Sequence, residues 1–198
     1  PAASSCAALS RDAVVRRQGA AVRMVDDTMS GAAKRPMRIL EVETFGRGGL
    51  IHYAYNLSCA LAERGHDVTL VTAAAYELEG RDVPPRLKVV KLIARVTHRL
   101  RASLPARVLG WLRKIEAIAD ACVVAVIARR LRPHVIHLHC TNQIALAYLI
   151  LLRLTGVPVV VTAHVVTAHE RTRFQDAVHR RIHQASPLII AHSEFDRN

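Results

Sequence analysis

Aromatic side chains are scarce in this sequence: Phe, Trp and Tyr make up 4% of its 198 residues, while hydrophobic residues make up 51%. A buried core must therefore be built mainly from Ala, Val, Leu and Ile. The shortage also disfavours nucleic acid as a partner, because proteins that bind single strands stack the bases on aromatic rings. The length is suitable for one domain, or for one domain with a tail.

Cysteine is also sparse, and the four cysteines are Cys6, Cys59, Cys122 and Cys140. Their spacing matches no paired CxxC metal site, and there are too few for a disulfide framework. The sequence therefore predicts buried free thiols in a reducing compartment, and we expect a cytoplasmic protein.

No run of residues reaches the roughly 18 consecutive apolar positions that a membrane-spanning helix requires. The nearest, Ile144–Val166, is broken by Arg153, Gly156 and Pro158, and its pattern is typical of a helix, a turn and a strand. The start of the chain has scattered Arg and no apolar core segment, which argues against a secretory signal. We expect residues 1–36 to be a disordered or wrongly assigned leader, and residues 37–198 to form the folded domain.

Acidic residues are few: 16 Asp and Glu stand against 28 Lys and Arg, for a net charge of +12. This excess favours anionic partners such as nucleotide diphosphates or acidic lipid surfaces. The excess is concentrated in Arg81–Arg132, where apolar residues interleave with the basic ones. One interpretation is a helix on an anionic membrane surface; the alternative is a solvated basic face. The membrane-facing candidates are Arg95, Arg99, Arg101 and Trp111.

Short apolar runs alternate with helical patterns along residues 37–198. The predicted strands are Met37–Val42, Val68–Thr72, Leu87–Leu92, Val135–His139, Val157–Ala163 and Leu188–Ala191. The predicted helices are one from Leu50 to Leu61, a long one after Ser103, and then Asn142–Leu154 and Arg171–Gln184. Apolar strands that alternate with helices predict an α/β fold: a Rossmann-like, doubly wound parallel sheet covered on both faces.

Two helices carry specific expectations. In the first, Leu50, Ala54, Leu57 and Leu61 share one face, and Gly65 follows the last turn as a left-handed terminator. In the long helix, Ser103 is the expected N-cap, with Pro105 in the first turn. Its apolar face would consist of Val108, Leu112, Ile115, Ala119, Cys122 and Val126. Pro133 would end that helix.

Ligands of doubly wound sheets bind beyond the carboxyl ends of the strands. The loop after the first predicted strand contains Gly46, Gly48 and Gly49 just before a helix, an arrangement that attracts phosphate or carboxylate groups. A plain tight turn is the alternative. The loop is not a dinucleotide fingerprint, because Ile51 replaces the third glycine and the second strand ends in Thr72 rather than an acid.

Histidines mark the ends of the fourth and fifth predicted strands. His137 and His139 alternate along one strand and so share a face, and His164 ends the next strand. Three such residues could bind zinc. We expect no metal, because no Cys or carboxylate is evidently placed to complete the ligand set. His164 is the best candidate for a polar contact to a ligand.

Taken together, these segments resemble glycosyltransferase family 4. The resemblance rests on an MRIL-type first strand with a Gly-Gly loop, and on four further segments in the expected order and spacing. These are LAERGHDVTLVT (Leu61–Thr72), RPHVIHLH (Arg132–His139), GVPVVVTAH (Gly156–His164) and ASPLIIAHSEFDRN (Ala185–Asn198). The similarity extends from Met37 to Asn198.

The resemblance implies the N-terminal half of a GT-B fold, in which two Rossmann-like domains face each other across a cleft. It implies transfer of a hexosyl-type sugar, with retention, from a nucleotide-diphosphate donor to an acceptor sugar or lipid-linked acceptor, without a catalytic metal or other cofactor. The N-terminal domain mainly holds the acceptor; the C-terminal domain, which holds the nucleotide, is absent from this chain, so we expect the fragment alone to be inactive.

Residue by residue, the resemblance places Gly48 and Gly49 near the donor diphosphate and His164 at the transferred sugar, as the catalytic candidate. It also matches His137 and His139 to histidines that bind donor or acceptor. The alternative is a non-catalytic Rossmann-like domain that recognises a nucleotide, a lipid head group or a regulatory partner.

Overall fold

The computed structural model describes residues 35–139, 144–163 and 188–191. The chain divides into two units, Pro1–Arg35 and Pro36–Asn198, and every helix and strand described belongs to the second. Of the expected leader, residues 1–36, only residues 35 and 36 are described. The predicted helix Arg171–Gln184 lies outside the described residues.

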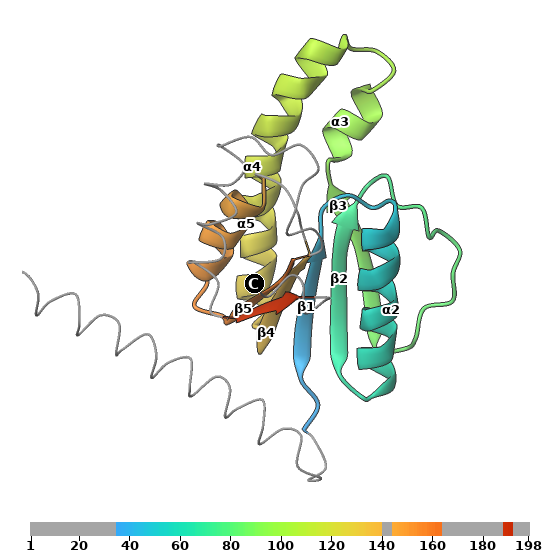
Figure 1. Cartoon of the computed structure of the whole chain (residues 1–198), viewed down its shortest axis with the longest axis vertical. Coiled ribbons are helices and arrows are strands. Elements are labelled where there is room, and N and C mark those ends of the chain that lie inside the picture. Colours follow the sequence, from blue (N-terminus) through green and yellow to red (C-terminus); the bar gives the residue numbers. More distant parts are fainter. Residues whose placement is uncertain (1–34, 140–143, 164–187, 192–198) are drawn as a thin grey trace, which may run out of the picture. The chain divides into compact units, whose positions relative to one another are not determined.

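Strands are interspersed with helices along the second unit, as Figure 1 shows. The strands are β1 (Arg38–Glu43), β2 (Asp67–Ala73), β3 (Leu87–Ile93), β4 (Val135–His139), β5 (Val159–Ala163) and β6 (Leu188–Ala191). The helices are α2 (Gly49–Glu63), α3 (Arg95–Leu100), α4 (Ala106–Leu131) and α5 (Ile144–Arg153).

Among the described residues, the six strands form one sheet in the order β3-β2-β1-β4-β5-β6, and every pairing is parallel. This is the strand order of the Rossmann fold, with the topological switch between β1 and β4. The predicted α/β class and all six predicted strands are confirmed.

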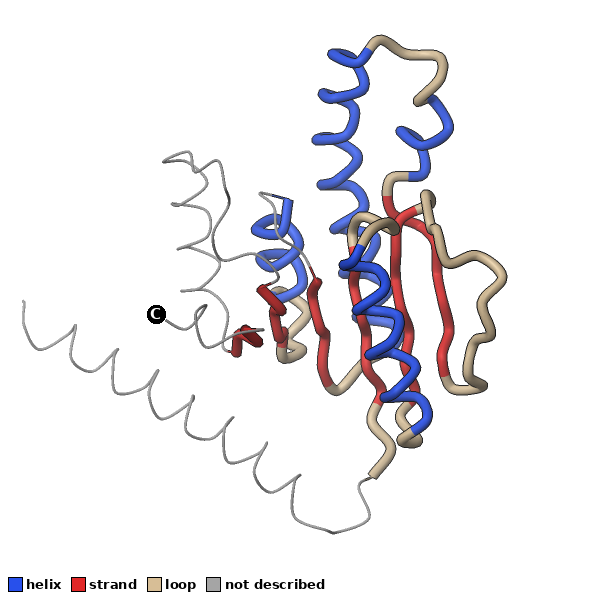
Figure 2. Tube along the Cα trace, turned by 45° about the vertical axis from the view of Figure 1, so that its right-hand side comes forward, coloured by secondary structure: helices blue, strands red, loops and turns tan. Residues whose placement is uncertain are grey.

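The sheet has a separate apolar layer on each face, and helices cover both (Figure 2). On one face, Leu40 and Val42 of β1 pack in a cluster with Val124 of α4 and Leu149 of α5. On the other, Ile39 packs in a cluster with Ile51 of α2. β1 is therefore buried on both sides from Ile39 onward, as expected for a parallel sheet between helices.

The end of α2 follows the sequence expectation. Gly65 has a φ of +90°, its amide donates to the carbonyl of Ala62, and the amide of His66 donates to that of Leu61. This pair of bonds is a Schellman motif, which needs a left-handed residue after the helix. The buried face of α2 is shifted from the predicted one, and consists of Ile51, Ala54, Tyr55, Ser58 and Ala62.

The predicted apolar face of the long helix is wrong. Val108 and Ile115 are 49% and 63% exposed, and Cys122, expected to be a buried thiol, is exposed. The residues that α4 buries are Glu116, Ala121, Val124 and Ala128. The reason is visible in Figure 1: the first half of α4 rises beyond the carboxyl ends of the strands, so the sheet does not cover it.

The start of α4 also differs from the prediction. Pro105 occupies the N-cap position and no side chain caps the helix. Ser103 belongs instead to a turn after α3, where its amide donates to the carbonyl of Leu100. The helix does end before Pro133, as predicted, with Arg132 in the left-handed conformation.

Candidate functional site

Strand register brings four polar side chains to one face of the sheet near the switch point. Glu41 of β1 is paired with His137 of β4, and Glu43 with His139. Alternate residues of a strand face the same side, so two carboxylates and two imidazoles meet on this face. All four residues are buried. His137 and His139 thus share a face, as the sequence predicts, but their carboxylate partner, Glu41, lies on a strand about 100 residues away.

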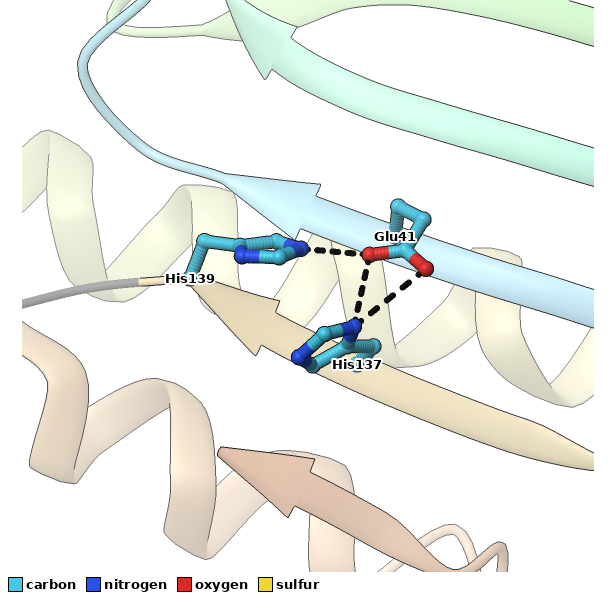
Figure 3. Close-up of side chains that lie close together, drawn as sticks. All are labelled: Glu41, His137 and His139. Carbon is cyan, nitrogen blue, oxygen red and sulfur yellow. Dashed lines mark hydrogen bonds and ion pairs between the residues drawn. The ribbon is translucent and has the colours of Figure 1, made fainter. Parts of the chain in front are cut away.

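Glu41, His137 and His139 form a hydrogen-bonded cluster, which we call the His–Glu–His array (Figure 3). Nε2 of His139 lies 2.5 Å, and Nδ1 of His137 lies 3.0 Å, from Oε2 of Glu41. An ionised carboxylate only accepts hydrogen bonds, so both imidazoles donate to it. The other ring nitrogen of His137 shares a 2.5 Å hydrogen bond with the hydroxyl of Thr162.

The array keeps a buried carboxylate ionised. Burial opposes ionisation of Glu41, but its hydrogen bonds and electrostatic interactions with His137 and His139 outweigh it and hold the pKa of Glu41 below its usual value. The edge of the Tyr53 ring from α2 lies against His139, with ring centroids 5.7 Å apart. A buried charge that is paired and hydrogen-bonded on several sides is tolerated, and it holds its neighbours in one geometry.

The same three side chains could hold a metal ion, since one ligand atom from each lies within 4.8 Å of the others. The premise that no carboxylate is placed near His137 and His139 is therefore wrong. Two of the three atom pairs, however, are only 2.5 and 3.0 Å apart. Tetrahedral zinc with bonds of about 2.0–2.1 Å needs ligand atoms about 3.3 Å apart. The observed geometry is that of an array bridged by protons.

The loop after β1 is anchored by hydrogen bonds to the side chain of Glu43. Its carboxylate accepts hydrogen bonds from the amides of Phe45 and Gly46, at 2.6 and 2.7 Å, and from the hydroxyl of Thr72 at 2.7 Å. Burial raises the pKa of Glu43, although these three donors lower it. Gly46 has a φ of +70°, and a Cβ atom there would lie 3.0 Å from the carbonyl oxygen of Ala75. The backbone path of this loop thus requires glycine.

The amide of Gly48, where a phosphate was expected, has a carboxylate partner in this structure. Oε1 of Glu77 accepts a 2.8 Å hydrogen bond from that amide and lies 3.2 Å from Nε2 of His52. The glycine loop therefore has an anion at the start of α2, supplied by the chain itself. Any external anion at Gly48 must displace Glu77.

A cavity of about 380 Å³ opens above the carboxyl ends of β1, β2 and β3. Its walls come from the loop after β1, the end of β2, and helices α3, α4 and α5. The ionisable side chains that line it are Arg47, His98, Arg101, Arg113, Glu116 and Asp120. The basic segment is evident in the sequence but this cavity is not, because its lining comes from residues spread over about 100 positions.

The membrane-facing candidates lie on α3, just after it, and on α4. Arg95 and Arg99 are exposed, and Trp111 is 70% exposed with the Lys114 ammonium 5.3 Å from its ring centroid. Arg101 lines the cavity. Other large exposed apolar residues on the two helices include Val96, Leu100, Val108, Ile115 and Ile118. In the described part of the chain, no helix combines the length and apolar character needed to cross a membrane. His164 lies outside the described residues.

Comparisons with known proteins identify the family. A family model described as a glycosyl transferase 4-like domain matches residues 48–198. No curated protein matches the chain.

Solved structures provide the fold comparison. MurG from Acinetobacter baumannii is 13% identical, with a TM-score of 0.54 over 79% of this chain and 42% of that one. UDP-N-acetylglucosamine 2-epimerase from Rickettsia bellii is 16% identical, with a TM-score of 0.49 over 81% of this chain and 40% of that one. The chain thus spans less than half the length of these proteins. The likeness to MurG extends to the Rossmann-like fold, and the family match covers most of the sequence; the chain belongs to the glycosyl transferase 4-like family.

Proposed function

We propose that this chain is the acceptor-side domain of a retaining glycosyltransferase that takes a hexosyl-type sugar from a nucleotide-diphosphate donor. Membership of the glycosyl transferase 4-like family supports glycosyl transfer in general. The observation that carries the specific role is the cavity of about 380 Å³ at the carboxyl ends of β1, β2 and β3. Doubly wound sheets bind their ligands at this edge, and the volume is in the range of small-ligand sites.

The chemistry requires that the negative charge developing on the leaving diphosphate be stabilised. We propose that the amide of Gly48 and the start of α2 supply part of this stabilisation once Glu77 has moved away. His164 is proposed, on the family resemblance alone, to donate a hydrogen bond to the transferred sugar. The His–Glu–His array fixes β1 against β4 beneath this edge, and the proposed reaction needs no bound metal.

The test is an assay of the full-length gene product with a panel of nucleotide sugars and acceptors, with the anomeric configuration of the product read by NMR. Ala117 lines the cavity, whereas Ala119, two residues along α4, is exposed and does not line it. We expect Ala117→Trp to raise KM for the acceptor while Ala119→Trp leaves it unchanged. Residues 1–198 alone should show no turnover.

Two results would count against this proposal. Equal kinetics for the two tryptophan variants would remove the cavity from acceptor binding. Tight nucleotide binding without transfer to any acceptor, by the full-length product, would favour the non-catalytic binding domain instead.

A peripheral location on the inner face of the membrane is proposed from the α3–α4 surface, where exposed Trp111 and Leu100 lie among arginines. Apolar side chains surrounded by basic ones suit an anionic lipid surface. The double variant Arg95→Glu/Arg99→Glu should lose flotation with anionic liposomes, whereas Arg130→Glu near the other end of α4 should not. Flotation that is unchanged in the double variant would contradict a membrane role for this surface.

A further inference from the structure

The cavity above β1, β2 and β3 has an unusual division of charge between its acids and its bases. Its acidic lining residues accept hydrogen bonds from backbone amides of the protein. Glu116 accepts from the amides of Val96 and Thr97, at 2.6 and 2.9 Å, and Asp120 accepts from the amide of Ala94 at 2.8 Å. These bonds tie the start of α3 to α4. Both carboxylates therefore have a structural role, which is to hold α3 against α4.

The basic lining residues are in the opposite situation. Within the described residues, the side chains of His98, Arg101 and Arg113 have no hydrogen-bond or ion-pair partner, although all three line the cavity. Arg47 gives its Nε to the carbonyl oxygen of Ala75 at 3.3 Å, which leaves its terminal nitrogens for another partner. The cavity thus presents guanidinium groups from three separate segments, and its own carboxylates are engaged elsewhere.

The two carboxylates also set where the guanidinium groups lie. Glu116 and Asp120 hold the first turn of α3, and α3 carries His98 and leads directly into Arg101. Arg113 lies on α4, one turn before Glu116. The bonds that hold α3 against α4 thus place cations from both helices at one cavity before any ligand arrives. Such preorganisation lowers the ordering cost of binding.

We infer that the acceptor held in this cavity carries a phosphate-class anion, bound by Arg101 and Arg113 with Arg47 at the glycine-loop side. The inference rests on the proposed function for the acceptor role, but not for anion binding itself. Guanidinium groups present planar, paired donors that match the oxygens of a phosphate. The anion belongs either to a soluble sugar phosphate or to the head group of a phospholipid-like acceptor, and the chemistry of recognition is the same.

The experiment is isothermal titration calorimetry of the purified chain with inorganic pyrophosphate, glucose 1-phosphate and, as the neutral probe, glucose. Variants Arg101→Gln and Arg113→Gln are compared with Arg99→Gln on α3 and Arg130→Gln on α4, two exposed arginines that do not line the cavity. We expect each cavity variant to weaken binding of the anionic probes about 10- to 100-fold, since each removes a charge-assisted hydrogen bond. The control variants should change it less than about twofold.

A second arm separates the two sources of the anion. Vesicles of phosphatidylcholine with and without phosphatidic acid replace the soluble probes, with Arg130→Gln as the control. Binding that needs phosphatidic acid and is lost in Arg113→Gln, with no affinity for glucose 1-phosphate, identifies a lipid head group. Affinity for glucose 1-phosphate without vesicle binding identifies a soluble sugar phosphate. Circular dichroism melts of all variants check that each remains folded.

Several results would overturn the inference. Equal weakening by the cavity and control variants would show a general charge effect. Equal affinity for glucose and glucose 1-phosphate, together with vesicle binding that does not need phosphatidic acid, would show that the anion is not recognised. Undiminished transfer to a phosphate-bearing acceptor by the full-length double variant Arg101→Gln/Arg113→Gln would overturn it while leaving the proposed function intact. Anion binding that depends on Arg101 and Arg113, in a full-length product that transfers no sugar, would refute the proposed function only.

Discussion

Replacing Glu41 tests whether the His–Glu–His array holds the sheet together. Glu41→Ala removes the common acceptor of His137 and His139, both of which are less than 10% exposed. Two imidazole N–H groups then stay buried without an acceptor, at about 1–3 kcal/mol each. A small void remains as well. The free energy of unfolding should therefore fall by about 3–5 kcal/mol, the range for breaking a buried pair from one side.

Urea denaturation followed by circular dichroism measures this loss. With a slope of about 1–3 kcal/mol per molar urea, the unfolding midpoint should fall by at least about 1 M. Glu41→Gln keeps one acceptor oxygen at nearly the same volume, so its loss should be smaller. Glu63→Ala, at an exposed position of α2, is the matched control and should stay within about 0.5 kcal/mol of the parent protein.

The pH dependence adds a readout that a simple volume change would not alter. The pKa of Glu41 is lowered in the folded state from 4.5, so the unfolded chain takes up its proton first as the pH falls. The stability that Glu41 contributes is complete above pH 4.5 and declines below it. Glu41→Gln should lack this part of the decline. A loss below about 1 kcal/mol for Glu41→Ala, or an unchanged acid limb in Glu41→Gln, would refute the proposed role of the array.

Three further predictions concern neighbouring features. The pKa of Glu43 is raised above 4.5 in the folded state, so its ionisation lowers the stability of the fold as the pH rises from 4.5 through the folded-state pKa. Glu43→Gln should remove this loss, and so change the dependence of stability on pH in the direction opposite to Glu41→Gln. A change in the same direction would contradict this. Gly46→Ala should destabilise the fold more than Gly48→Ala. Both glycines have a positive φ, which costs an alanine about 1–2 kcal/mol at either position, but of the two only an alanine at position 46 would also make a close contact with Ala75. Equal unfolding midpoints in urea would disprove the contact. Zn²⁺ or a chelator should leave the melting temperature unchanged, and a rise with Zn²⁺ that His139→Asn abolishes would establish a metal site instead.

Local patterns in the sequence determined the order and type of the elements. Apolar, β-branched runs such as Val157–Ala163 favour a strand buried on both faces, and intervening helical segments favour parallel crossovers. Helix ends were equally local: Gly65 accepts the left-handed conformation and Pro133 cannot continue a helix. The shared face of His137 and His139 followed from the two-residue period of a strand.

The hydrogen-bond partner of those histidines lies far from them in the sequence. Glu41 stands inside an apolar run, and an acid at a buried position is rare enough to signal a paired charge. Its pairing with His137 and His139, however, depends on β1 and β4 being neighbours in the sheet, which β2 and β3 separate along the chain. Sequence distance alone could not indicate that contact.

Tertiary structure also decided which side of α4 is buried. Periodicity identifies a stripe of apolar residues, but the stripe of Val108, Ile115 and Val126 is largely exposed and Glu116 is buried. The first half of α4 extends beyond the sheet, and α3 is the described element beside it (Figure 1). There Glu116 is buried in place of an apolar residue, because its carboxylate accepts hydrogen bonds from the amides of Val96 and Thr97 in the first turn of α3. The same packing creates the cavity and its arginines, because a cavity depends on how segments distant in sequence are placed against one another.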